Sequence, residues 1–263
     1  MLEIHQIPAL NDNYIYFLLD KASRELAVVD PSAAAPVLDE LVKNNWKLKY
    51  IFNTHHHSDH VGGNLVLKEK TGCKIYASKQ DARIPGVDFL LDEGDSISIG
   101  ASNGEVFSIP GHTSAHIAYY FRESASLFCG DTIFSLGCGR VFDGTMEQLW
   151  KSLDRLRKLA PDTKIYCAHE YTLENALFAR ALDGANVDLQ KFIAHAERLR
   201  EENLPTVPSL LRDELLANPF LRPESLAIQE KLKIPAGTDL SVVFKIIRET
   251  KDRFDHGENV FRN

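Results

Sequence analysis

The spacing of hydrophobic positions divides the chain into a strand-rich part and a helical part, which meet near residue 170. Short apolar runs bounded by turn residues predict strands at 14–19, 26–29, 49–53, 74–77, 97–99, 105–109, 118–121, 126–129 and 164–168. Apolar residues at helical spacing predict helices at 34–44, 65–70, 144–159, 173–181, 187–200, 209–216 and 240–253. The first of these helices is expected to bury one face, which carries Val37, Leu38, Leu41 and Val42.

The order of these elements predicts the fold class. Two blocks of strands, each with helices between or after its strands, indicate an α/β protein with two sheets packed face to face under outer helices. Gly, Asn and Ser between the strands of residues 89–131 favour mostly antiparallel pairing there. No strand is predicted after residue 170, so we expect two domains, one at 1–169 and an all-helical one at 170–263.

Composition and charge restrict the class of protein. With 263 residues, of which 44% are hydrophobic and 25% charged, the chain suits an ordinary soluble globular protein. Its apolar runs fall short of the about 18 residues that a membrane span requires, and its first residues do not resemble a signal peptide. A net charge of −7 argues against nucleic acid as a partner. The four cysteines form no CxxC pair, and we expect a reducing cytoplasm as their environment.

The stretch THHHSDHVGG at 54–63 is the strongest chemical signal in the chain, and it follows a predicted strand directly. In an extended backbone the first and third of its histidines share a side, while His56 points the other way. Leaving several imidazoles and a carboxylate unpaired in a core is costly, and a divalent metal satisfies them all. The alternative, a solvated polar loop, explains this density of ligands less well. The candidate ligands here are His55, His57, Asp59 and His60.

Three more candidates, His112, Asp131 and His169, each stand where a predicted strand ends. Each alone would be assigned to a turn or a helix cap, but together with the first stretch they make five histidines and two aspartates. That set exceeds the four ligands of one zinc and suits two metals that share a bridging carboxylate and a water. Nitrogen and oxygen ligands accept zinc, iron and manganese alike. His116 is expected to support the ligands from behind rather than to join them.

Four motifs surround these candidates: THHHSDHVGG, PGHTSAH at 110–116, CGDT at 129–132 and AHEYT at 168–172. Together they resemble the metallo-β-lactamase superfamily. Further motifs are NDNY at 11–14, GCGR at 137–140, GT at 144–145, PTVPS at 205–209, NPF at 218–220, Arg248, and KDRF at 251–254. With these, the chain resembles the hydroxyacylglutathione hydrolase (glyoxalase II) family from about residue 7 to residue 254. The resemblance implies a metallo-β-lactamase αβ/βα sandwich with a C-terminal all-helical domain.

The resemblance also implies a role for each matching position. The first metal is expected on His55, His57 and His112, the second on Asp59, His60 and His169, and Asp131 is expected to bridge them. Asp59 and Asp131 are then also the expected catalytic residues, since Asp59 would orient the attacking hydroxide. The implied glutathione contacts are Arg140, Phe142, Tyr171, Arg248 and Lys251. Phe142 stands where the family often has a tyrosine, so one hydroxyl contact is expected to be missing.

The implied activity is hydrolysis of S-D-lactoylglutathione and related S-2-hydroxyacylglutathiones to D-lactate and glutathione, the second step of methylglyoxal detoxification. A hydroxide bridging two divalent metals, zinc before iron or manganese, would attack the thioester. The expected partner is this small substrate, with no nucleic acid or membrane, and the protein is expected to be a cytoplasmic monomer.

Two alternatives stay open at this point. One is another enzyme of this fold, such as a glutathione persulfide dioxygenase with a single iron, although the motifs of the helical tail favour the hydrolase. The other is a non-catalytic metal-binding protein. Structural sites are typically closed by four ligands, however, so a set of seven favours an enzyme.

Overall fold

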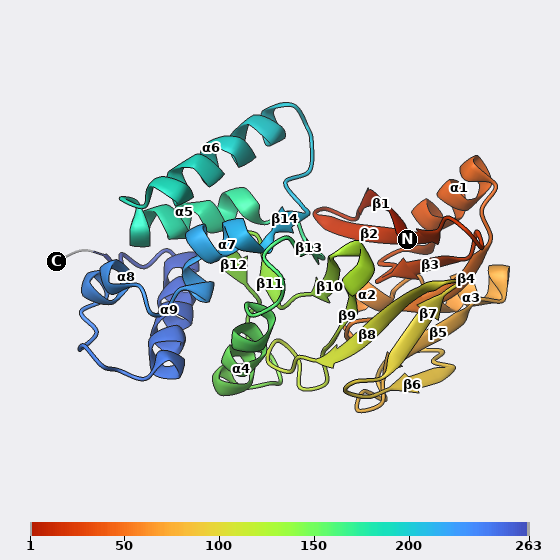
Figure 1. Cartoon of the computed structure of the whole chain (residues 1–263), viewed down its shortest axis with the longest axis horizontal. Coiled ribbons are helices and arrows are strands. Elements are labelled where there is room, and N and C mark those ends of the chain that lie inside the picture. The colour runs from red at the N-terminus through yellow and green to blue at the C-terminus, as the bar shows by residue number, and fades with distance from the viewer. Residues whose placement is uncertain (1, 262–263) are drawn as a thin grey trace.

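The computed structural model describes residues 2–261 and contains two six-stranded sheets packed face to face (Figure 1). In spatial order the first sheet consists of β1 (Leu2–Ala9), β2 (Asn13–Asp20), β3 (Leu26–Val29), β4 (Leu48–Phe52), β5 (Lys74–Ser78) and β6 (Phe89–Leu91). The second consists of β14 (Ser209–Leu210), β13 (Lys164–Cys167), β10 (Ser126–Gly130), β9 (Ile117–Phe121), β8 (Ser102–Ser108) and β7 (Ser96–Ile99). A short hairpin pairs β11 (Ile133–Phe134) with β12 (Gly137–Cys138).

Helices lie outside the sheets and make up most of the last third of the chain. They are α1 (Ala34–Asn44), α2 (Ser58–Val61), α3 (Asn64–Thr71), α4 (Met146–Leu156), α5 (Thr172–Asp183), α6 (Val187–Glu201), α7 (Leu211–Ala217), α8 (Leu226–Lys231) and α9 (Leu240–Asp255), with 3₁₀ turns at Arg122–Ser124 and Pro219–Leu221. Helices α1 and α3 cover the first sheet, and α6 to α9 form the cyan and blue part of Figure 1. The predicted α/β class with a helical C-terminal part is therefore confirmed. No helix described between residues 2 and 261 is long and apolar enough to cross a membrane.

Strand β2 shows why its sequence is continuously apolar, because both of its faces are buried. Tyr14, Tyr16 and Leu18 enter the core between the two sheets, where they meet residues such as Phe128 of the second sheet. The alternate residues, among them Phe17, enter a separate core under α1 and α3. One strand thus contributes to two hydrophobic cores, which fixes its register against both layers.

The core between the sheets continues into the helical part of the chain. The ring of Trp150 in α4 stacks on Phe244 in α9, with centroids 5.5 Å apart, and Phe220 packs nearby within the same core. Helix α4 itself begins with a capping box in which Thr145 and Gln148 satisfy each other's backbone N–H groups. Helices α5, α7, α8 and α9 therefore share one hydrophobic core with the sheets, whereas α6 packs in a separate cluster with Leu136 of the β11–β12 hairpin.

The candidate site residues follow strands that run in the same direction. Strands β3 and β4 are parallel, and so are β10 and β13, while β8 points the same way as β10 because both are antiparallel to β9. The loops that leave the C-terminal ends of these strands therefore meet at one edge of the sandwich. Polar residues collect at this edge because the strands themselves are filled with apolar side chains.

The structure corrects several sequence-based expectations. Strand β14 lies after residue 170, where no strand was expected, and the edge strand β1 was not predicted because His5 and Gln6 interrupt its apolar pattern. Val42 was expected on the buried face of α1 but is 83% exposed, whereas Val37 and Leu41 are buried. Strands β7 to β10 pair with one another in antiparallel fashion, as predicted.

Candidate metal centre

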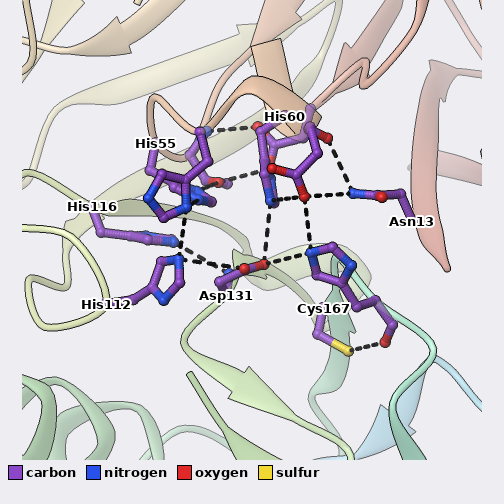
Figure 2. Close-up of polar contacts among 12 residues, drawn as sticks. Asn13, His55, His60, His112, His116, Asp131 and Cys167 are labelled. Carbon is purple, nitrogen blue, oxygen red and sulfur yellow. Dashed lines mark hydrogen bonds and ion pairs between the residues drawn. The ribbon is translucent and has the colours of Figure 1, made fainter. Parts of the chain in front are cut away.

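The first group of candidate ligands joins His55, His57 and His112 (Figure 2). His55 and His57 follow β4, and His112 follows β8 and a Pro-Gly turn. His57 Nδ1 lies 3.1 Å from His55 Nε2 and 3.1 Å from His112 Nε2, so three ring nitrogens converge. His56 points away, as alternation predicted, and its Nδ1 lies 2.8 Å from Asp81 Oδ2.

The second group joins Asp59, His60 and His169. Asp59 and His60 lie on the single turn of α2, which starts where the extended segment ends, and His169 follows β13. Asp59 Oδ2 lies 3.5 Å from His60 Nε2 and 3.4 Å from His169 Nε2. Two ring nitrogens and one carboxylate oxygen therefore face a common point.

Asp131 lies between the two groups. Its Oδ1 is 3.4 Å from His60 Nε2 and 3.4 Å from His169 Nε2, while its Oδ2 is 3.4 Å from His112 Nε2. One carboxylate oxygen is therefore directed at each group, as Figure 2 shows. Gly130 directly before it has φ +49° and sits against Thr54 and His116, so a side chain at this position would collide with both.

Each histidine of the two groups except His57 has a partner on its other ring nitrogen. Asp12 Oδ1 lies 2.7 Å from His169 Nδ1, and Asp30 Oδ2 lies 3.0 Å from His60 Nδ1. The further contacts are Arg140 O at 2.8 Å from His112 Nδ1 and Thr54 Oγ1 at 3.0 Å from His55 Nδ1. Such outer contacts select the tautomer and orient the ring, as they do behind metal-bound histidines.

Burial and neighbouring charges shift the pKa values of these histidines in opposite directions. Burial lowers the pKa of His55 well below its usual range and that of His57 to about 4, so both rings are neutral at pH 7. Burial also opposes a charge on His169, but Asp131 and Asp12 outweigh it and raise the pKa of His169 to about 9. The first group is thus ready to donate nitrogen lone pairs, and the carboxylates of the second attract a cation.

A divalent metal fits this arrangement. His60 Nε2 and Asp131 Oδ1 are buried and have no hydrogen-bond partner among the residues described. Leaving a buried donor or acceptor without a hydrogen bond is costly. These two atoms lie 3.4 Å apart with Asp59 and His169 around them, and together the four side chains offer the ligand atoms that a metal ion needs. Neutral imidazole nitrogens and carboxylate oxygens suit zinc, iron or manganese.

The two groups open into a cavity of about 690 Å³ at the junction of the sheets and the helical part. All five residues expected to contact glutathione line it, namely Arg140, Phe142, Tyr171, Arg248 and Lys251. The ring of Tyr171 stacks on His169 with centroids 4.7 Å apart, and Phe142 lies 5.1 Å from the ring of His57. The structure therefore brings the five predicted substrate-binding residues and five of the seven predicted metal ligands to one cavity, with His55 and His60 fully buried beside those ligands.

The cations of α9 are more enclosed than expected. Arg248 and Lys251 are 2% and 6% exposed, and Arg248 Nη1 donates to the carbonyl of Cys138 at 3.0 Å. The acidic residues around them were not singled out from the sequence, because acidic residues on a terminal helix usually face solvent. Asp30, which holds His60 from behind, was also missed. It directly follows strand β3, as several candidate ligands follow their strands, and this position is the signal that could have identified it.

His116 supports the first group without joining it, in agreement with the sequence-based expectation. Its ring stacks on His55 with centroids 4.6 Å apart, and its Nε2 accepts a hydrogen bond of 3.3 Å from the backbone nitrogen of Asp131. It is fully buried, and burial lowers the pKa of its imidazole well below the usual range. A neutral His116 therefore connects one ligand of the first group with the aspartate between the groups.

Two family comparisons cover nearly the whole chain. Residues 14–169 match the metallo-beta-lactamase superfamily, and residues 170–254 match the hydroxyacylglutathione hydrolase C-terminus. A curated relative, the hydroxyacylglutathione hydrolase of Methylococcus capsulatus, is 49% identical over 255 residues, which cover 97% of this chain and 99% of the relative.

Solved structures share the fold of this chain. The B3 metallo-beta-lactamase BLEG-1 has a TM-score of 0.64 and 22% identity over 83% of this chain and 99% of its own, which shows a shared fold. TTHA1623, solved in a di-iron-bound form, has a TM-score of 0.54 and 26% identity over 64% of this chain and 91% of its own. The fold, the motifs and the full-length similarity agree, and the chain belongs to the hydroxyacylglutathione hydrolase family of the metallo-β-lactamase superfamily.

Proposed function

We propose that this enzyme hydrolyses S-D-lactoylglutathione and related S-2-hydroxyacylglutathiones to D-lactate, or the corresponding acid, and glutathione. One observation carries the proposal: two His/Asp groups joined by Asp131 open into the same cavity as Arg140, Arg248 and Lys251. A hydrolytic centre and a cluster of cations suited to a peptide with two carboxylates thus lie within one cavity. In the cell this reaction is the second step of methylglyoxal detoxification.

The proposal assigns the site residues as follows. His55, His57 and His112 hold one divalent metal, Asp59, His60 and His169 hold the other, and Asp131 bridges them. Zinc is the proposed metal, with iron or manganese as alternatives, and the di-iron form of TTHA1623 supports a pair of ions in this fold. Residues 1–169 form the proposed catalytic domain, and residues 170–263 form the proposed helical domain that binds glutathione.

Metals held here would supply Lewis acidity, which makes a water nucleophilic at neutral pH and polarises a carbonyl group. Asp59 is well placed to orient that water, because Asn13 Nδ2 holds its side chain by a hydrogen bond of 3.2 Å to Oδ2. The water oxygen bonds to the thioester carbon, the C–S bond breaks, and the sulfur leaves as a thiolate that takes up a proton. Products are a carboxylic acid and glutathione.

The remaining residues position the substrate. Arg140 is 58% exposed in its side chain and reaches over the cavity, where its guanidinium can bind a glutathione carboxylate. Tyr171 stands beside His169 and offers a phenol group to the peptide part of the substrate. Phe142, 64% exposed, covers the rings of His57 and His112 with an apolar surface. Holding the reacting groups in place in this way contributes strongly to rate.

The proposal extends to the setting of the enzyme. We expect a cytoplasmic monomer that binds neither nucleic acid nor membrane, and four cysteines that are free and buried agree with a reducing compartment. The alternatives raised by the sequence, a persulfide dioxygenase and a non-catalytic metal-binding protein, are not favoured, because the match at 170–254 is to the hydrolase family.

The test is hydrolysis of S-D-lactoylglutathione by the purified protein, with and without a chelator, together with metal counting. Turnover that the chelator abolishes, with about two metals per chain, is the expected result. Two bound metals without turnover would discard this substrate, and other thioesters would then be tried. Oxygen consumption with glutathione persulfide but no thioester hydrolysis would favour the dioxygenase.

A further inference from the structure

Asp255 lies among the three cations of the cavity. Its Oδ2 is 3.4 Å from Arg140 Nη2 and 3.9 Å from Arg248 Nη2, and its Oδ1 forms an ion pair with Lys251. Arg140 comes from the loop after β12, whereas the other two cations and Asp255 belong to α9. Asp255 itself lines the cavity with a side chain that is 21% exposed. A carboxylate of the protein thus occupies the place where these cations converge.

The position of Asp255 is electrostatically unfavourable for the helix alone. It is the last residue of α9, and the C-terminal end of a helix carries a partial negative charge that disfavours a carboxylate. Asp255 also stands four residues after Lys251, and a helical ion pair is weaker when the acidic residue follows the basic one than when it precedes it. The stabilisation of this carboxylate therefore comes from the side-chain cations that face the cavity, and not from the helix dipole.

The cations in turn need a negative partner when the cavity is empty. Lys251 is 6% exposed, burial lowers the pKa of its ammonium group, and Asp255 acts against that shift while Arg248 and Arg140 add to it. An isolated buried cation next to two others would be costly. Arg248 already pairs with Asp252 at 2.9 Å, and Asp255 removes the remaining cost at Lys251 in the absence of any ligand.

We propose that Asp255 occupies the anion site of the empty enzyme and must give way to a carboxylate of the glutathione moiety when substrate binds. The inference rests on the proposed function, which supplies glutathione as the ligand. Asp255 therefore weakens substrate binding and, equally, promotes release of the product glutathione. It is a residue that sets affinity without taking part in the chemical step.

The test compares the metal-loaded wild type with Asp255→Asn in calorimetric titrations with glutathione. The variant is expected to bind glutathione roughly three- to tenfold more tightly, the range expected for one partly screened charge pair. With glutathione ethyl ester, which is blocked at the glycine carboxylate, the variant and the wild type should bind with equal affinity if that carboxylate is the competitor. Glu258→Gln is the matched control, because it removes one negative charge from an exposed pair with Arg253 at the same helix end.

Thermal unfolding separates this role from a structural one. Asp255→Asn should melt lower than wild type without ligand, but glutathione should raise its Tm by more than it raises that of wild type. A purely structural Asp255 would lower the Tm and leave the ligand-induced rise unchanged or smaller, which would overturn the inference. The inference would also be overturned if the wild type binds glutathione and the variant binds it no more tightly.

A second measurement needs no variant. Hydrogen exchange of the wild-type amides at 252–256 should become faster when glutathione binds, because Asp255 loses its ion pairs at the end of α9. Unchanged or slower exchange there would contradict the displacement. A wild type that neither binds glutathione nor hydrolyses the thioester would instead refute the proposed function, and this inference with it.

Discussion

The carboxylate of Glu214 in α7 accepts a hydrogen bond of 3.0 Å from the backbone nitrogen of Leu136, at the tip of the β11–β12 hairpin. Leu136 has φ +56°, an uncommon conformation for this residue type, and it is fully buried. Ser135 donates to the same carboxylate at 3.0 Å, and Asn218 donates to the carbonyls of Phe134 and Gly137. Side chains of the helical part thus satisfy a strained turn that lies between Asp131 and Arg140.

Replacing Glu214 with Ala should destabilise the protein by about 2–4 kcal/mol, because buried donors of the hairpin tip lose their acceptor. Glu214→Gln keeps one acceptor oxygen and should restore part of the loss. Urea unfolding of the metal-loaded protein measures both. Glu249→Ala, at an exposed pair with Lys245 on α9, is the control, and equal stability of the two Ala variants would contradict the role of Glu214.

Asp12→Asn should lower the affinity for the second metal about 10- to 100-fold, because the neutral amide of asparagine is a weaker acceptor for the Nδ1–H of His169 than the carboxylate of Asp12. Competition with a chromophoric chelator would show one weakened site and one unchanged site. Asp39→Asn, an exposed aspartate on α1, provides the control. Two unchanged affinities in Asp12→Asn would show that His169 needs no such support or is not a ligand.

Asp131→Ala should lose metal stoichiometry as well as activity, since its two oxygens face the two ligand groups separately. Elemental analysis after dialysis against metal-free buffer is the measurement. A variant that keeps full metal content while losing activity would count against a bridging role and favour a purely chemical one.

Acid should weaken the first sheet through Asp88. Burial raises the pKa of this carboxyl, but Lys68 Nζ at 2.8 Å and the amide of Ile75 at 3.0 Å outweigh it and lower the pKa to about 2. A lowered folded-state pKa means that the stabilisation is complete above the ordinary value of 3.8 and is lost as the pH falls towards 2.

Asp88→Asn should therefore cost about 1 kcal/mol of unfolding free energy at pH 6, a value reduced because Lys68 is partly exposed to solvent, and little near pH 2. Urea midpoints of the two proteins at pH 6, 4 and 3 would show the difference shrink. A difference that stays constant with pH would mean that packing, and not charge, makes Asp88 important.

Sequence reasoning located the chemistry well because its signal is local. His55, His57 and His60 stand within one short stretch, and His112, Asp131 and His169 each follow a run of apolar residues that marks a strand end. The packing of those runs brings their ends together, so the approximate location of the site could be inferred from hydrophobic pattern alone. The assignment of individual metal ligands stays a prediction until metals are counted.

The parts that were missed depend on contacts between distant segments. Strand β1 has a weak pattern because it is an edge strand with one partner, and β14 is a two-residue strand that forms only by pairing with β13. Asp255 looks like a surface residue at the end of a terminal helix, and only the docking of α9 against the loop after β12 brings it beside Arg140. No local pattern encodes such docking.

The stacking of Trp150 on Phe244 also bears on how members of this family could be recombined. A C-terminal segment exchanged between relatives at residue 169 would leave α4 behind, and the apolar face of α4 would meet a foreign α9. The segments that must be exchanged together to preserve this packing are therefore not contiguous in the sequence. A chimaera would have to carry α4 together with the segment after residue 169 and keep the pairing of β14 with β13. The parental protein should melt in a single calorimetric transition.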